Sequence, residues 1–239
     1  MTIKPLNVIR SWADGVFSLF VPRLCVVCGA KLIDGEKYMC LGCMAEMPQT
    51  NIHRTRPNRI HELLMPVRKP VDKAASLFYY NRNDPYSNLI REAKYYGRPD
   101  IYTHLARGFA SVLKADGFFD GMDVILPVPV HFTRRIMRGY NQTEYLARGL
   151  AEVSGLPVGD NLVAVRPHTS QTRRKGEQRR MNVARCYGVS RPGELDSLHI
   201  LVVDDVITTG ATLASVIELL HSALPSCRTS VLSLALTSS

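Results

Sequence analysis

The segment from His199 to Thr212 contains the residues best suited to chemistry. It begins with an aliphatic and β-branched run, reaches the two adjacent carboxylates Asp204 and Asp205, and continues through small hydroxylated residues and a glycine. The backbone N–H groups of such a loop, together with the dipole of a helix that follows it, bind phosphate groups. The carboxylates accept hydrogen bonds from the vicinal hydroxyls of a ribose, or hold a metal ion that bridges to them. The pattern therefore indicates a site for a phosphorylated sugar.

The residues that we expect to form this site are Asp204, Asp205, Val206, Thr208, Thr209, Gly210, Ala211 and Thr212. The threonine hydroxyls add hydrogen bonds, and the glycine lets the backbone approach an anion closely. Receiver domains of phosphorelay proteins also begin with a hydrophobic strand that ends in two aspartates. Several strand–helix units follow that strand in a receiver, whereas about one unit remains here, so the receiver interpretation is excluded.

Four cysteines form two Cys-x-x-Cys pairs near the N-terminus, at Cys25, Cys28, Cys40 and Cys43. Each pair presents two sulfurs from one tight turn, and four thiolates in this order suit a tetrahedral Zn²⁺ ion. Because four cysteine ligands leave no open coordination position, we expect the zinc to be structural. Disulfides or buried free thiols are the alternatives. Cys186 and Cys227 are isolated and are assigned no chemistry.

Two strongly basic segments follow the cysteine pairs. The first comes after a predicted strand and offers Val130, His131, Arg134, Arg135 and Arg138. Guanidinium groups fit phosphate oxygens bidentately, although a solvated basic loop is the alternative. The second, residues 166–185, contains Arg173, Arg174, Lys175, Arg179 and Arg180. It suits either a lid over a pyrophosphate or a contact with a nucleic-acid backbone, and its few aromatic residues do not indicate a base-stacking platform there.

Composition limits the class of protein. The 239 residues carry a formal net charge of +9, which favours an anionic partner or substrate. Six cysteines in such a chain suggest metal ligands before disulfides. No apolar run approaches the roughly 20 residues that span a bilayer, and the N-terminus does not resemble a signal peptide. We therefore expect a cytoplasmic protein without a membrane span.

Predicted strands and helices alternate over the second part of the chain. The expected strands cover residues 74–80, 124–128, 162–166, 200–203 and 229–236, and the expected helices cover 86–95, 101–115, 141–154 and 211–223. This alternation predicts an α/β fold with a parallel sheet flanked by helices. The expected organisation is a docking helix over 1–22, a zinc ribbon over 23–47, an extended connector over 48–73 and a main domain over 74–239.

The segment Val203–Thr212 resembles the phosphoribosyl-pyrophosphate (PRPP) signature of type I phosphoribosyltransferases. A larger pattern resembles the ComF family of competence-associated proteins, also called GntX-like. That pattern comprises the two Cys-x-x-Cys pairs, Pro127-Val-Pro-Val-His131, Arg138-Gly-Tyr-Asn-Gln142, Gln171-Thr-Arg173, Arg180-Met-Asn-Val183 and the signature itself. The resemblance covers about residues 25 to 236.

This resemblance implies the type I phosphoribosyltransferase fold with a small hood. Asp204 and Asp205 would bind the ribose hydroxyls of PRPP, directly or through Mg²⁺, and residues 206–212 would hold the 5-phosphate. The segment after Val128 would be the pyrophosphate loop, and residues near 168–182 the flexible loop. The family is linked to natural transformation, the handling of incoming single-stranded DNA, which makes other competence or DNA-uptake proteins possible partners. No stretch in the hood identifies a nucleobase pocket.

Two hypotheses follow. The first, which we favour, is a DNA-uptake factor of the cytoplasm that binds single-stranded DNA through the zinc ribbon and the basic segments and retains a PRPP site. The second is an active phosphoribosyltransferase that transfers phosphoribose from Mg-PRPP to an unidentified acceptor. In the second case Arg134, Arg135 and Lys175 would stabilise the charge of the leaving pyrophosphate.

Overall fold

A computed structural model describes residues 22–130, 132–165 and 186–238, with no side-chain description for 132–134. The predicted helix over 1–22 falls almost wholly outside the described residues. So do His131 and the basic segment 166–185 with Arg173, Arg174, Lys175, Arg179 and Arg180. Within the three described ranges, no helix has both the length and the apolar character needed to cross a bilayer.

Four parallel strands form the central sheet, in the order β1-β6-β5-β2. Their bounds are Ala74–Tyr80 for β1, Val124–Pro127 for β2, His199–Ile207 for β5 and Arg228–Thr237 for β6. Parallel neighbours need crossover connections, and these are supplied here mainly by helices. The predicted α/β architecture with a parallel sheet is confirmed.

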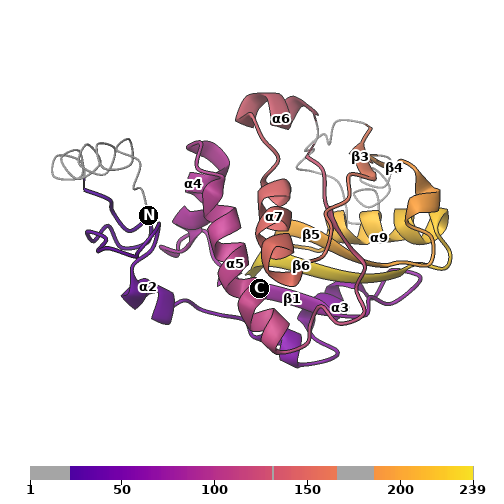
Figure 1. Cartoon of the computed structure of the whole chain (residues 1–239), viewed down its shortest axis with the longest axis horizontal. Coiled ribbons are helices and arrows are strands. Elements are labelled where there is room, and N and C mark those ends of the chain that lie inside the picture. Colours follow the sequence, from indigo (N-terminus) through magenta and orange to yellow (C-terminus); the bar gives the residue numbers. More distant parts are fainter. Residues whose placement is uncertain (1–21, 131, 166–185, 239) are drawn as a thin grey trace, which may run out of the picture.

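Helices cover both faces of this sheet (Figure 1). Their bounds are Arg59–Leu64 for α3, Ser87–Tyr95 for α4, Asp100–Ala115 for α5, Gln142–Ser154 for α7 and Ala211–Ala223 for α9. The side chains of β5 alternate between two apolar clusters: Leu201 and Val203 pack with α4, α5 and α7, whereas Ile200 and Val202 pack with α3 and α9. This burial on both faces explains why the strand reads as a continuous apolar run.

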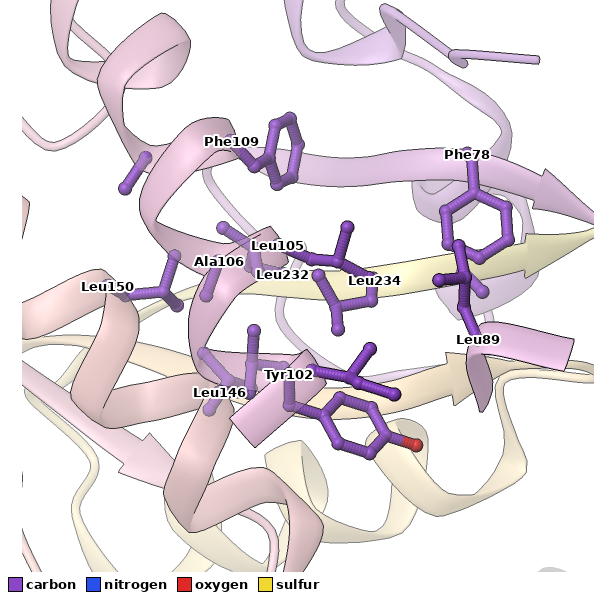
Figure 2. Close-up of a cluster of buried hydrophobic side chains, with 14 of the residues drawn as sticks. Phe78, Leu89, Tyr102, Leu105, Ala106, Phe109, Leu146, Leu150, Leu232 and Leu234 are labelled. Atoms are coloured by element: carbon purple, nitrogen blue, oxygen red, sulfur yellow. The ribbon is translucent and has the colours of Figure 1, made fainter. Parts of the chain in front are cut away.

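Helices α5 and α7 pack closely against each other on the first face. Figure 2 shows Leu105, Ala106 and Phe109 of α5 among the leucines of α7 and β6. Gly149 of α7 allows the close approach, because a Cβ atom there would lie 2.6 Å from the carbonyl oxygen of Thr103. The Thr103 hydroxyl of α5 also donates a 3.0 Å hydrogen bond to the backbone carbonyl of Tyr145 in α7.

Residues 48–73 are not the extended connector that we predicted. They form a 3₁₀ helix η1, Ile52–Arg54, and the helix α3, and the Thr50 N–H donates to the carbonyl of Leu77 in β1 at 2.9 Å. The buried side chains Ile60, Leu64, Val67 and Val71 belong to the second apolar cluster. The prolines of this segment suggested an extended chain. The apolar residues between them instead recur at the spacing that puts side chains on one buried face of a helix.

Three further segments differ from the sequence-based expectations. Strand β5 continues to Ile207, so the acidic pair lies within the strand rather than after it. Part of the predicted basic loop is a short helix, α6, Phe132–Arg138. The predicted strand near 162–166 is β3, Leu162–Ala164, which pairs antiparallel with β4, Tyr187–Val189, in a separate two-stranded sheet. Short elements complete the described chain: α2, Leu41–Ala45, and a 3₁₀ helix η2, Pro192–Glu194.

Substitution of Gly149 by alanine tests the packing of α5 against α7. The added methyl would lie 2.6 Å from the Thr103 carbonyl oxygen and 2.7 Å from the Cβ of Ala106, so the two helices must separate. We expect the free energy of unfolding to fall by about 1–3 kcal/mol, the usual cost of overpacking a core. A lower midpoint in a urea titration measures the loss.

Gly108→Ala is the matched control, because Gly108 lies in the exposed part of α5 and its Cβ would meet nothing within 4 Å. The better helix propensity of alanine should raise the stability by up to about 1 kcal/mol. Equal midpoints for the two variants would contradict the close packing at Gly149.

Candidate functional site

The acidic pair of β5 is neutralised by the helices of the first face. Lys94 of α4 places its Nζ atom 2.8 Å from Oδ2 of Asp205. The Tyr102 hydroxyl of α5 donates a 3.2 Å hydrogen bond to the same oxygen, and the ring of Tyr102 lies in the apolar cluster of Figure 2. The backbone N–H of Asp205 donates to Oδ1 of Asp204 at 2.9 Å. Both carboxylates are partly buried.

The two carboxyl groups differ in their protonation. Burial, followed by the charge of Asp205, raises the pKa of Asp204 to about 7. Burial also raises the pKa of Asp205, but the Lys94 ammonium and its hydrogen bond lower it further, so the net shift is downward. Below neutral pH the pair therefore carries one negative charge, on Asp205. A cation or a set of hydroxyl donors beside the pair would favour full ionisation.

The loop after β5 leads directly into a helix N-terminus. β5 ends at Ile207, a short bend covers residues 208–210, and α9 begins at Ala211. Gly210 is the N-cap of α9 with a φ of 72°, in the left-handed region that favours glycine. A Cβ at this position would also lie 3.3 Å from the Cβ of Leu63. The glycine is therefore required by the turn itself, and the turn directs backbone N–H groups of the first helical residues toward the loop.

These elements enclose a hollow of about 280 Å³. The predicted residues that line it are Asp204, Asp205, Val206, Thr208, Thr209, Gly210, Ala211, Thr212, Val130 and Arg138. Arg135 is not part of this lining: it is exposed, and its Nη1 lies 3.7 Å from Oε1 of Glu144. The structure thus brings the acidic pair, the loop, the N-terminus of α9 and one arginine to a single hollow.

Lys94, Tyr102 and Gln142 are site residues that the sequence analysis did not identify as such. Gln142 lines the hollow and is 0% exposed, yet neither its Nε2 nor its Oε1 has a hydrogen-bond partner among the described residues. A buried amide without partners costs about 1–3 kcal/mol. Such an amide, facing a hollow, is suited to give one donor and one acceptor to a bound molecule.

The four predicted cysteine ligands also come together. The sulfur atoms of Cys25, Cys28, Cys40 and Cys43 all lie within 4.8 Å of one another. Burial raises the pKa of the Cys25 thiol, but backbone N–H groups of Cys28 and Cys40 lower it, to a net value of about 6. The backbone N–H of Cys40 lies 3.4 Å from the Cys25 sulfur. This arrangement of soft sulfur donors is able to hold a metal ion.

The cysteine cluster is attached to the helices that support the acidic pair. The Tyr86 hydroxyl, next to α4, donates a 2.7 Å hydrogen bond to the carbonyl of Cys43. The ring of Tyr38 meets His104 of α5 edge-on at 5.6 Å and lies 5.3 Å from the guanidinium carbon of Arg98. Cys25 and Cys43 are both buried in the first apolar cluster. The cysteine segment and α5 therefore share one core.

Part of the chain matches a known protein family. Residues 118–236 match the protein family described as "Phosphoribosyl transferase domain". The matched segment contains β5, α9 and every residue that lines the hollow except Lys94.

Two relatives extend the match toward the N-terminus. The chain is 27% identical over 213 residues to the DNA utilization protein YhgH of Salmonella typhimurium, covering 84% of this chain and 92% of that protein. It is 22% identical over 193 residues to the competence protein ComFC of Bacillus subtilis, covering 76% and 77% of the two chains.

Among solved structures, the adenine phosphoribosyl transferase of Trypanosoma brucei matches with a TM-score of 0.38 and 12% identity, over 76% of this chain and 81% of that chain. The assignment of the fold rests on the four-stranded parallel sheet and on the match to the phosphoribosyl transferase family. The chain contains a phosphoribosyl transferase domain and is a distant homologue of the DNA utilization protein YhgH and of the competence protein ComFC.

Proposed function

We propose that the chain is a cytoplasmic DNA-uptake factor that binds PRPP with Mg²⁺ and handles single-stranded DNA. One observation carries the PRPP half of the proposal: the acidic pair, the loop at 208–210 and the N-terminus of α9 line one hollow inside the segment that matches the phosphoribosyl transferase family. The helix N-terminus suits the 5-phosphate of PRPP, and the carboxylates suit its ribose hydroxyls.

The donor set of the hollow is compatible with Mg²⁺. Carboxylate oxygens are the hard ligands that this ion prefers, and Asp204 and Asp205 would hold it together with substrate phosphates. Bound Mg²⁺ would neutralise part of the pyrophosphate charge. Arg138 and Lys94 add fixed positive charge to the same lining. The unpartnered amide of Gln142 would then find its hydrogen bonds on the bound molecule.

The DNA half of the proposal is supported by the relatives and by charge. The relatives are named a DNA utilization protein and a competence protein. The formal net charge of +9 favours a polyanion. The basic segment at 166–185 lies outside the described residues and remains a predicted contact with either pyrophosphate or DNA.

For the cysteine cluster we propose a structural zinc ion. Zinc–sulfur bonds of about 2.3 Å in a tetrahedron place neighbouring sulfurs about 3.8 Å apart. The sulfurs of Cys28 and Cys40 are 3.8 Å apart, and all four are within 4.8 Å. Four protein ligands leave no open position, so the ion would hold the segment together without reacting.

An active phosphoribosyltransferase is the second candidate. Arg138 favours it, because a guanidinium in the lining would stabilise the charge of a leaving pyrophosphate. Release of pyrophosphate from PRPP, screened against nucleobases and single-stranded DNA, separates the two candidates. Turnover with a base supports the enzyme, whereas DNA binding without turnover supports the uptake factor.

Addition of PRPP and Mg²⁺ should raise the thermal midpoint of the chain. At a ligand concentration of 100 times the dissociation constant, binding stabilises the native state by about 2.7 kcal/mol, or roughly 5–10 °C for a chain of this size. Replacement of the pair, Asp204→Ala with Asp205→Ala, should abolish the shift. Differential scanning fluorimetry measures both effects.

Glu144→Gln is the matched control, since Glu144 is an acid that pairs with Arg135 outside the hollow. It should keep the full shift. Gln142→Leu replaces the buried amide by an apolar group of similar size, so it should not lower the ligand-free midpoint but should reduce the shift. A normal shift in the double aspartate variant would show that PRPP binds elsewhere or not at all.

Metal analysis of the purified chain should find one zinc ion per molecule. Substitution of Cys25, Cys28, Cys40 or Cys43 by serine removes one of four ligands and should release the metal, because the remaining three do not complete the tetrahedron. Atomic absorption gives the zinc content. Cys227→Ala, a change at a cysteine outside the cluster, should leave it unchanged. Full zinc retention in the four serine variants would refute the site.

A further inference from the structure

Two adjacent tyrosines stand exposed at the end of α4. Among the exposed large hydrophobic side chains of the described residues, the aromatic ones are Tyr95, 67% exposed, and Tyr96, 64% exposed. Tyr95 is the last residue of the helix and Tyr96 its C-cap, whose N–H donates to the carbonyl of Glu92 at 3.1 Å. Both backbones are therefore fixed, and two aromatic faces are offered to solvent from a rigid support.

A guanidinium from a distant part of the sequence reaches these rings. The Cζ atom of Arg138, at the end of α6, lies 5.3 Å from the ring centroid of Tyr95. In the view of Figure 1, α4 and α6 both lie toward the upper edge of the molecule. On α6, Ile136 is 65% and Met137 is 86% exposed. The contact between Arg138 and Tyr95 thus brings a cationic and an aromatic group together from distant parts of the sequence.

An open hollow adjoins Tyr95 on this surface. Arg82, Arg91, Lys94 and Tyr95 are among its lining residues. The single carboxylate of that lining, Asp205, is bound by Lys94 at 2.8 Å.

Two glutamates near α4 and α6 are also bound, each to an arginine. Glu92 contacts Arg98 at 3.2 Å, and Glu144 contacts Arg135 at 3.7 Å. Asp84 of the preceding turn accepts the backbone N–H of Tyr86. Because of Arg82 and Arg91, this surface therefore has an excess of positive charge.

We propose that single-stranded DNA docks on this tyrosine surface, defined here as Tyr95, Tyr96, Arg82, Arg91 and Arg138. Unpaired bases stack on exposed aromatic rings, and guanidinium groups neutralise the phosphates between them. A duplex would not expose its base faces to the two rings. The inference rests on the proposed DNA role and adds the place of contact, which lies next to the PRPP hollow through the shared residues Lys94 and Asp205.

The test is binding of the full chain to a fluorescent oligodeoxythymidylate of about 20 nucleotides, longer than one site of about 4–16 nucleotides. The double variant Tyr95→Leu with Tyr96→Leu keeps apolar side chains but removes the aromatic faces. It should bind about tenfold more weakly or worse, as expected for lost base stacking. The double variant Tyr95→Phe with Tyr96→Phe keeps the faces and should bind like the wild type.

A second variant tests the cationic part of the surface. Arg91→Gln removes one exposed guanidinium one helical turn before Tyr95. The slope of log K against log salt should become shallower by about 0.7, the contribution of one phosphate contact on a single strand. Thermal midpoints of all variants, measured in the same buffer, show that they are folded.

The outcomes separate the two proposals. If the wild-type chain does not bind the oligonucleotide, the proposed DNA role fails. If it binds but the leucine variant binds equally well, or a duplex of the same length binds as tightly as the single strand, the DNA role survives and the tyrosine surface is wrong. An unchanged salt slope in Arg91→Gln would likewise remove Arg91 from the contact.

Discussion

Two neighbouring carboxylates near the end of a buried strand are costly unless other groups neutralise them, and much of this fold is arranged around that requirement. Asp205 receives the ammonium of Lys94 and the hydroxyl of Tyr102, which come from consecutive helices of the same layer. Those helices hold their positions because α5 packs against α7 at Gly149 and against β6 through shared leucines. For Asp204, burial and the charge of Asp205 outweigh the lowering effect of Lys94, so its pKa is raised. The chemistry of the hollow therefore depends on helix packing on one face of the sheet.

The opposite face contributes the other half of the hollow. α9 is anchored by apolar side chains such as Leu213 and Val216, and α3 packs beside it. Leu63, next to the buried Leu64, lies against Gly210, the residue that turns the chain from β5 into α9. A segment of many prolines thus supports the loop that we assign to phosphate binding.

Local patterns in the sequence predicted most of the central fold. The apolar run before Asp204 predicted β5, and the helices over 86–95, 101–115, 141–154 and 211–223 begin within one residue of those in the structure. The spacing of the two cysteine pairs predicted that their four sulfur atoms lie close together, because each pair forms a local turn and the spacer between the pairs is short. These features depend on neighbours in the sequence, and so sequence alone can specify them.

The residues that were missed depend on contacts across the chain. Lys94 looked like an ordinary basic residue near a helix end, and its partner Asp205 is far away in the sequence. Gln142 was one polar residue after a helix cap, and only the fold shows that its amide is enclosed beside the hollow. For residues 48–73, the prolines led to the prediction of an extended connector. The regular spacing of the buried residues Ile60, Leu64, Val67 and Val71 was the better indicator of structure.

The bond between Lys94 and Asp205 has a consequence for communication between ligands. Lys94 and Asp205 line both hollows, so they form a wall common to them. A molecule in either hollow that draws the ammonium away from the carboxylate changes the charge presented to the other. Coupling between two binding equilibria is reciprocal, so the factor by which one occupant alters the affinity for the second equals the factor in the reverse direction. The wall would thus make the two sites energetically dependent on each other without any movement of the sheet.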